Sequence, residues 1–210
     1  MDTAWGKIYV LAGVNGAGKS SVLGAMLREI EGGEFWNPDE VAKELREDDP
    51  SLTLEQAQSI AWDEGVAYLR RAIEVGAAIA FETTLGGRTI TRILAEAVRA
   101  GRELNIWYVG LDSVDRHIER VKARVAAGGH DIPEQRIRER YQTSHINLAT
   151  LALLATELRV YDNSAPGNPE HEDRPEPRLL LHVREGGVVM SVPRDQAPPW
   201  CEAVFDVVGA

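Results

Sequence analysis

The segment GVNGAGKS, residues 13–20, limits more strongly than any other feature the folds that this chain can adopt. It fits the pattern G-x-x-x-x-G-K-[ST], in which glycines let backbone N–H groups turn inward around phosphate oxygens. An apolar run at residues 7–12 precedes it, and a helical pattern follows over about residues 19–31. Strand, glycine-rich turn and helix together predict a P-loop, so we expect an α/β P-loop NTPase fold with three layers.

Strand and helix patterns then alternate as far as about residue 164. The expected strands are 77–81, 105–111 and 158–161, and the expected helices are 39–46, 53–75, 88–100, 114–127 and 133–155. This alternation predicts a parallel sheet covered by helices on both faces.

The end of the chain departs from the alternation. Residues 165–178 hold four of the ten prolines and are typical of an exposed loop. Residues 179–192 then predict a β-hairpin that turns at Gly186-Gly187, and 199–208 predict a short helix. We expect residues 1–210 to form one domain, with the loop, hairpin and helix of 165–210 at its C-terminal end.

Composition narrows the functional class. The formal net charge of −10 argues against a general nucleic-acid binder, which would normally be basic. No apolar run approaches the roughly 20 residues that cross a bilayer, and the first residues lack the features of a secretory signal. A lone cysteine, Cys201, fits a reducing compartment. We therefore expect a cytoplasmic protein that binds neither nucleic acid nor membrane.

The P-loop assigns roles to its own residues. The backbone of Gly13, Asn15, Gly16, Ala17 and Gly18 is expected to cradle the ATP phosphates, together with Lys19, Ser20 and Ser21. Lys19 supplies a positive charge to the outer phosphates and is expected to face solvent in the empty loop. The Ser20 hydroxyl can bind Mg²⁺, and the helix that follows directs its positive dipole end at the same anion. ATP and Mg²⁺ are the cofactors that this pattern predicts.

Phosphoryl transfer also needs a residue that orients the attacking hydroxyl and accepts its proton. Asp39 follows a short strand that ends at Phe35 and Trp36, which is where such an acid belongs in many small P-loop kinases. A helix begins here, so Asp39 is equally well explained as its N-cap. Glu40 is the neighbouring alternative.

A second acid, Glu82, ends the expected strand 77–81. If that strand lies beside the P-loop strand, Glu82 emerges at the carboxyl edge of the sheet, where ligands bind in open α/β folds. It could then hold a Mg²⁺-bound water, while Thr83 or Thr84 contacts substrate. The alternative is an ordinary polar strand end.

Arginines recur at helical spacing around a glycine turn at Gly128-Gly129. Arg116, Arg120 and Arg124 share one helix face, with no acid at the intervening i+4 positions, and Arg136 and Arg140 repeat the spacing after the turn. Guanidinium groups suit phosphate geometry, so residues 116–145 are interpreted as an arginine-rich helical lid over a triphosphate. About half of these arginines are expected instead to be surface residues paired with nearby glutamates.

Several segments together resemble the zeta-toxin family of P-loop kinases, over about residues 7–164. The matching segments are AGVNGAGKSS (12–21), NPDEVA (37–42), FETTL (81–85), RVKARVAAGGHDI (120–132), IRERY (137–141) and YDNS (161–164). The P-loop alone is generic, whereas the GGH and RY segments followed by YDNS are much more specific.

The resemblance implies ATP-dependent phosphorylation of the amino-sugar hydroxyl of UDP-N-acetylglucosamine. It implies roles for Lys19, Ser20, Asp39, Thr83 or Thr84, Arg124 and Arg140. We also expect Arg120 and Asn163 to contact ATP, and Arg136 and Glu82 to contact substrate. Relatives have antitoxin partners, but this chain carries no recognisable fused antitoxin and is shorter than plasmid-type toxins. A nucleoside or polyol kinase, and a nucleotide-dependent switch with little turnover, are the alternatives.

Overall fold

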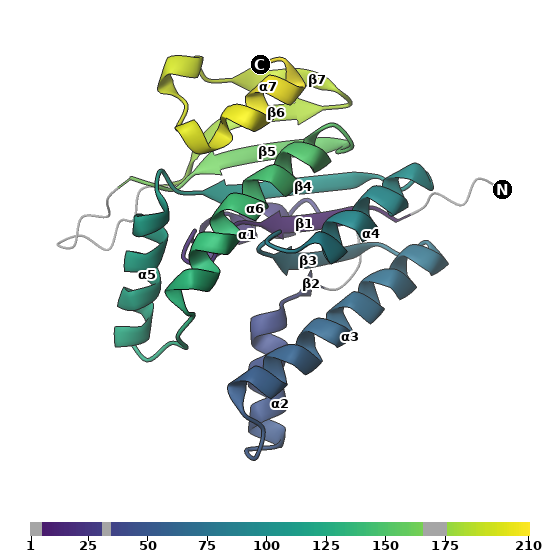
Figure 1. Cartoon of the computed structure of the whole chain (residues 1–210). Helices are drawn as coiled ribbons and strands as arrows, with labels where there is room; N and C mark the ends of the chain where they lie inside the picture. Colours follow the sequence, from purple (N-terminus) through teal and green to yellow (C-terminus); the bar gives the residue numbers. More distant parts are fainter. Residues whose placement is uncertain (1–5, 31–34, 166–175) are drawn as a thin grey trace.

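The computed structural model describes residues 6–30, 35–165 and 176–210 (Figure 1). These residues form a seven-stranded sheet in the order β2-β3-β1-β4-β5-β6-β7. The strands are β1 (Ile8–Ala12), β2 (Phe35–Trp36), β3 (Ile79–Thr83), β4 (Leu104–Gly110), β5 (Glu157–Asp162), β6 (Arg178–Arg184) and β7 (Gly187–Ser191). The strands β1 to β5 pair in parallel, and β6 and β7 are added antiparallel. The expected α/β fold is confirmed, while most of the proline-rich segment lies outside the described residues.

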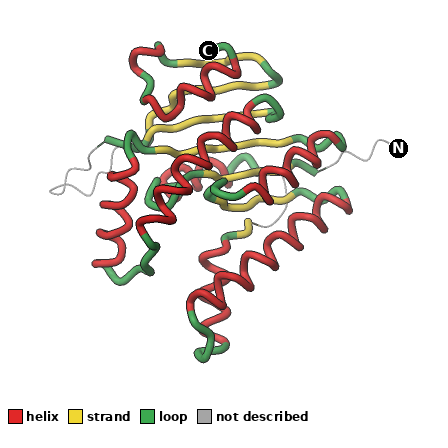
Figure 2. Tube along the Cα trace, in the orientation of Figure 1, coloured by secondary structure: helices red, strands yellow, loops and turns green. Residues whose placement is uncertain are grey.

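Helices connect the parallel strands, and one more helix follows the last strand (Figure 2). They are α1 (Ser20–Leu27), α2 (Pro38–Asp48), α3 (Leu54–Val75), α4 (Arg88–Arg99), α5 (Val114–Ala126), α6 (Glu134–Ala152) and α7 (Glu202–Val208), the last preceded by a 3₁₀ turn at Pro199–Cys201. The start of α3 shows why the sequence sets these limits. Thr53 and Gln56 form a reciprocal capping box, in which each side chain accepts a hydrogen bond from the other residue's backbone N–H. Within the described ranges, no helix is both long and apolar enough to pass through a bilayer.

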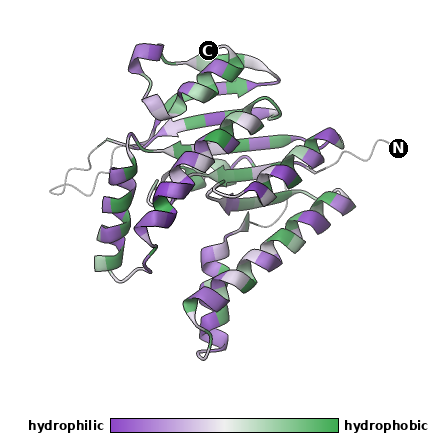
Figure 3. Ribbon diagram, viewed as in Figure 1, coloured by the Kyte–Doolittle hydropathy of each residue, from purple (hydrophilic) through white to green (hydrophobic). Residues whose placement is uncertain are grey.

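The two faces of the sheet are covered unequally. In β1, Ile8, Val10 and Ala12 point into a large core that includes residues of α3, α4, α6 and α7. Tyr9 and Leu11 point the other way, into a smaller core that packs on α1. Burial on both faces explains why β1 is a continuous apolar run rather than an alternating one (Figure 3). The P-loop therefore follows a strand that is buried on both faces of the sheet.

The C-terminal hairpin turns one residue earlier than predicted. Its two turn residues are Glu185 and Gly186, with φ of 50° and 75°, and β7 already begins at Gly187. Two consecutive residues with positive φ match the turn type that suits the twist of a two-residue hairpin, so this turn displaces the expected Gly186-Gly187 pair. Further along, Trp200 fills the space beside the end of β4, where a Cβ on Gly110 would lie 2.4 Å from the indole ring.

Candidate active site

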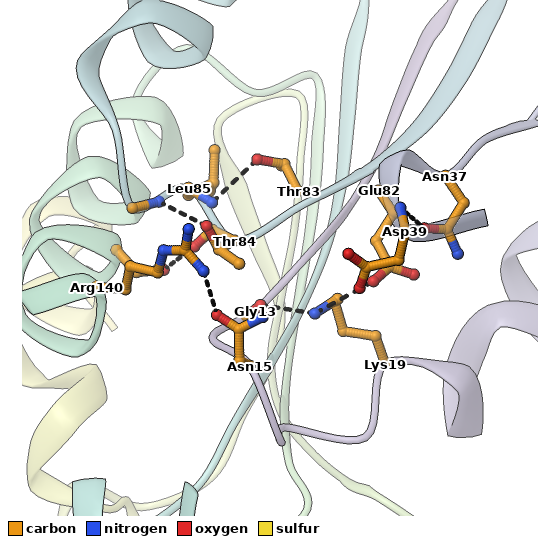
Figure 4. A network of polar contacts seen from close by, with 12 residues as sticks. Gly13, Asn15, Lys19, Asn37, Asp39, Glu82, Thr83, Thr84, Leu85 and Arg140 are labelled. Atoms are coloured by element: carbon orange, nitrogen blue, oxygen red, sulfur yellow. Dashed lines mark hydrogen bonds and ion pairs between the residues drawn. The ribbon is translucent and has the colours of Figure 1, made fainter. Parts of the chain in front are cut away.

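The P-loop runs from the end of β1 into α1 and is enclosed by neighbouring elements (Figure 4). Gly16 and Gly18 both have φ of 82°, a conformation that residues with a side chain rarely adopt. A Cβ on Gly16 would lie 2.6 Å from the carbonyl oxygen of His117, and one on Gly18 would lie 2.4 Å from Asn163 Nδ2. Glycine is thus required both by the turn itself and by the close approach of α5 and of the segment after β5.

Lys19 does not face solvent, so that expectation is wrong. Only 9% of its surface is exposed. Its Nζ donates a hydrogen bond of 2.9 Å to the carbonyl oxygen of Gly13 and lies 3.3 Å from Glu82 Oε1 (Figure 4). A buried ammonium group needs such partners, since an unpaired charge is costly to remove from water. The lysine is therefore held over the loop by two oxygen atoms, one from Gly13 and one from Glu82.

Glu82 reaches this position because β3 is the direct neighbour of β1. In the parallel register, Leu11 lies opposite Glu82 and Ala12 lies opposite Thr83. The carboxylate therefore stands at the carboxyl edge of the sheet beside the P-loop. Ser20 begins α1 directly after Lys19, and it is not among the described residues that line the cavity beside the P-loop. A hydroxyl and a carboxylate are hard oxygen donors of the kind that Mg²⁺ prefers, so this pair fits the predicted metal.

The threonines after Glu82 shape the turn that leaves β3. Thr83 Oγ1 accepts a hydrogen bond of 3.1 Å from the backbone N–H of Leu85, and Thr84 Oγ1 accepts one of 3.3 Å from Gly86. These bonds support a turn in which Leu85 has φ of 51°. A hydroxyl that accepts one hydrogen bond can still donate another, so both threonines keep a donor for a ligand.

Asp39 is not the N-cap of α2, so that interpretation is wrong. The N-cap is Asn37, whose Oδ1 accepts a hydrogen bond of 3.0 Å from the backbone N–H of Asp39, and Pro38 occupies the first helical position. Because proline fixes the start of the helix, Asp39 falls one residue inside it. Its side chain is 46% exposed, with Oδ1 4.0 Å from His130 Nε2. Glu40 is also exposed, but it is not among the described residues that line the cavity beside the P-loop.

Two of the lid arginines donate hydrogen bonds to backbone carbonyl groups of this chain. Arg120 Nη2 donates a hydrogen bond of 2.7 Å to the carbonyl oxygen of Asn163, and Asn163 Nδ2 donates one of 2.8 Å to Ala17 in the loop. Arg124 Nη2 donates one of 3.2 Å to the carbonyl oxygen of His130 and does not line the cavity. These contacts connect α5 with the P-loop and with the turn that follows the helix.

Arg140 contacts a side chain of the P-loop directly. Its Nη1 donates a hydrogen bond of 2.7 Å to Asn15 Oδ1, and its aliphatic part packs on Gly86, where a Cβ would lie 2.6 Å from Arg140 Cγ. Burial lowers the pKa of the guanidinium from its very high ordinary value, with Arg136 acting in the same direction. The group nevertheless remains charged at neutral pH. A cation whose side-chain hydrogen-bond partner is a neutral amide is well suited to receive an anion.

Other arginines form ordinary ion pairs. Arg138 Nη2 lies 2.8 Å from Glu134 and 3.0 Å from Asp115, and is half exposed. Arg116 Nε lies 2.8 Å from Asp112, an acid four residues before it, so the arginine stripe is partly neutralised, contrary to the expectation. Asp112 precedes α5, so a pattern restricted to the helix does not include it.

These groups surround a cavity of about 590 Å³. Its lining includes Asn15, Lys19, Asp39, Glu82, Thr83, Thr84, His130, Arg136 and Arg140. The side chains of Lys19, Asp39 and Glu82 come from three different elements and are drawn together in Figure 4. The structure therefore gathers most of the residues predicted for substrate and catalysis around one space, and leaves Arg124 outside its lining.

One wall of the cavity was missed by the sequence reasoning. Trp36 and Tyr68 stack with ring centroids 5.4 Å apart, and Trp62 lies on the same wall. A signal was present in Gly65, since a glycine inside a 22-residue helix is unfavourable unless something needs the room. A Cβ there would lie 2.7 Å from Trp36 Nε1. These aromatic residues offer apolar, planar surface within a cavity that is also lined by charged side chains.

A parallel sheet with a P-loop at its central strand, and acids at the carboxyl edge, defines the class of P-loop kinase-type nucleotide-binding proteins. Within that class, the chain belongs to the zeta-toxin family. The profile of that family, described as "Zeta toxin", matches residues 4–167. The match covers the P-loop, the cavity and the whole lid.

Individual relatives are more distant. An uncharacterized protein of Haemophilus influenzae is 27% identical over 135 residues, which cover 64% of this chain and 92% of that protein. In the crystal structure of AvrRxo1-ORF1:-ORF2 with ATP, one chain aligns with a TM-score of 0.64 at 14% identity, over 99% of this chain and 64% of that chain. The PezAT chromosomal toxin-antitoxin system of Streptococcus pneumoniae aligns with a TM-score of 0.58 at 12% identity, over 99% and 80%. The present chain thus spans about two thirds of the matched AvrRxo1 chain, and at these identities the structural likeness concerns the fold.

Proposed function

We propose that this chain is a kinase that transfers the γ-phosphoryl group of ATP to a hydroxyl group of a small molecule. The observation that carries the proposal is that Lys19 and Asp39 line the same cavity. A nucleotide-dependent switch needs the lysine but has no need of a carboxylate held beside it. Because the helix is capped by Asn37, the carboxylate of Asp39 is available for a ligand.

In the proposed step, the acceptor hydroxyl donates its hydrogen bond to the Asp39 carboxylate. The acceptor oxygen then forms a bond to the γ-phosphorus, the bond from that phosphorus to the β,γ-bridging oxygen breaks, and the hydroxyl proton passes to Asp39. The products are ADP and a phosphorylated acceptor. Lys19 and Arg140 stabilise the charge on the transferred group, and fixed cations of this kind lower the barrier without reorganising during the reaction. Mg²⁺, held by Ser20 and by Glu82 through water, would neutralise part of the phosphate charge.

For the acceptor, we propose UDP-N-acetylglucosamine or a closely related sugar nucleotide. Membership of the zeta-toxin family supports this choice. A chain of net charge −10 must concentrate positive charge locally to hold two phosphorylated ligands, and Arg136 and Arg140 contribute such charge to the cavity. The neighbour PezAT is a toxin-antitoxin system, so a protein antitoxin is a further candidate partner.

The acceptor prediction is tested by incubating the protein with MgATP and UDP-N-acetylglucosamine, and analysing the products by mass spectrometry. We expect a product that carries one additional phosphate group. The KM for this acceptor should rise with salt, because ionic contacts near the surface are screened over about 8 Å at physiological ionic strength. Neutral sugars, nucleosides and polyols are the parallel acceptors. Good turnover of one of them, without any sugar-nucleotide product, would reject the acceptor and retain the kinase.

The lid arginines give a second test. Arg140→Ala is expected to lower kcat by roughly 10²-fold or more while the affinity for ATP changes much less, since the contact is made mainly to charge that develops in the transition state. Arg138→Ala is the matched control, because this arginine lies on the same helix but pairs with Glu134 and Asp115 on the surface. Arg124→Ala is also expected to lower kcat more than ATP binding, but indirectly, because Arg124 holds the carbonyl group of His130, a residue that lines the cavity. Wild-type kcat in Arg140→Ala would return that residue to a structural role.

A further inference from the structure

A buried histidine on α5 binds the backbone of the P-loop. His117 is fully buried, and its Nδ1 lies 2.9 Å from the carbonyl oxygen of Asn15. A carbonyl oxygen can only accept a hydrogen bond, so Nδ1 must carry the proton. The two residues are 102 positions apart, and nothing in the sequence pattern of α5 singles out this contact.

The imidazole ring of His117 stays neutral, with a proton on Nδ1 alone. Its Nε2 is buried without a hydrogen-bond partner among the described residues. Burial lowers the pKa of His117 to about 4, so the ring is neutral at physiological pH and the Nδ1–H tautomer is fixed. Tyr141 packs edge-on against it with ring centroids 5.6 Å apart, and His145 packs against Tyr141 at 4.5 Å. The histidine is therefore a rigid, permanently oriented donor.

This hydrogen bond determines which way one peptide group of the P-loop points. In a planar trans peptide the C=O of Asn15 and the N–H of Gly16 point in opposite directions. When His117 binds the carbonyl oxygen, the Gly16 N–H is turned away from α5. Without that bond the peptide could rotate, because Gly16 is a glycine with φ of 82° and has few steric limits. Rotation would present a carbonyl oxygen to a phosphate in place of a donor.

The side chain of Asn15 is held by the second lid helix, α6. Arg140 Nη1 binds Asn15 Oδ1 at 2.7 Å, so both the backbone and the side chain of Asn15 are fixed, one by α5 and one by α6. We propose that His117 is a positioning residue of the phosphate site, which keeps the Asn15–Gly16 peptide in the orientation that binds nucleotide phosphates. This inference rests on the proposed nucleotide-binding function and adds to it a residue that touches neither nucleotide nor acceptor.

The test compares three variants of the full-length protein. His117→Leu removes the donor at similar size and is expected to weaken MgATP binding about tenfold or more, measured by isothermal titration calorimetry. His117→Asn keeps an N–H donor at the same distance from the backbone as Nδ1, and should recover most of the affinity. His145→Leu is the matched control: His145 is also buried, with its pKa lowered to about 4 by burial, and belongs to the same ring cluster without contacting the P-loop. It should bind MgATP like the wild type at a temperature where it is folded.

A second measurement does not depend on any nucleotide. Hydrogen–deuterium exchange of the peptide that covers residues 13–18 is expected to rise in His117→Leu and to stay at the wild-type level in His145→Leu. Wild-type affinity in His117→Leu, equal loss in His145→Leu, or no recovery in His117→Asn would each overturn the positioning role. If the wild type itself fails to bind MgATP, the proposed function is wrong, while the exchange measurement still decides whether His117 holds the loop.

Discussion

Replacing Asp39 with asparagine is expected to lower kcat by roughly 10²-fold or more while leaving the affinity for MgATP close to that of the wild type. Asparagine preserves the shape of the side chain but cannot accept the proton of the acceptor hydroxyl, and positioned acid–base groups typically contribute 10² to 10⁴ in rate. Steady-state kinetics with saturating acceptor, together with calorimetric ATP binding, measures the two quantities separately.

The structure offers a close control for this experiment. Glu40 lies next to Asp39 on the same turn of α2, is exposed, and is not among the described residues that line the cavity. Glu40→Gln should therefore retain wild-type kcat. The melting temperature of Asp39→Asn should also change little, since Asn37 supplies the cap. Normal turnover in Asp39→Asn would remove this residue from the mechanism, whatever happens to stability.

Substitution of Lys19 by alanine is expected to lower kcat for phosphoryl transfer by about 10² to 10³ or more, which leaves no measurable transfer. The reason is that it removes a fixed cation from the transferred phosphoryl group. It should also cost stability. Lys19 is the cation that pairs with Glu82, whose side chain is only 18% exposed, so its loss leaves a largely buried carboxylate without this partner. Such losses are about 1–3 kcal/mol in the free energy of unfolding.

The two effects can be separated. Adding Glu82→Gln to Lys19→Ala neutralises the unpaired carboxylate and should restore part of the free energy of unfolding, measured by urea denaturation, while transfer stays absent. Lys43→Ala removes an exposed lysine that pairs with Glu47 on α2, and should change neither quantity. Unchanged ATP turnover in Lys19→Ala would contradict the assignment of the P-loop.

The parts of this protein that were predictable are those encoded locally. The P-loop, the capping box at Thr53 and the alternation of strands and helices each depend on neighbouring residues, and the fold expected from them is confirmed. The orientation of Lys19 was not predictable, because it depends on β3 lying beside β1 and on a carboxylate 63 positions away. The role of Asp39 as a cap was equally open until the structure gave that place to Asn37.

The other features that the sequence did not predict are contacts between segments that lie far apart in the chain. The hydrogen bond between His117 and Asn15, and the stacking of Trp36 on Tyr68, join residues that share no sequence pattern. A helical period indicates which residues face inward, but it does not identify the group that each will meet. For the stacked pair, Gly65 gave a local indication that a bulky partner lies nearby.

The sheet continues past the family match, which ends at residue 167. Leu180, Leu181 and Val183 of β6, with Trp200 and Phe205 further on, belong to the same core as β1 and β4. A fragment cut at the family boundary would lack these residues and would expose the apolar surface that they cover. It would also turn β5 into an open edge strand, which can pair with other chains and aggregate. Domain boundaries drawn from family likeness would therefore divide a single hydrophobic core, and the C-terminal residues should be retained whenever this protein is shortened or fused to another.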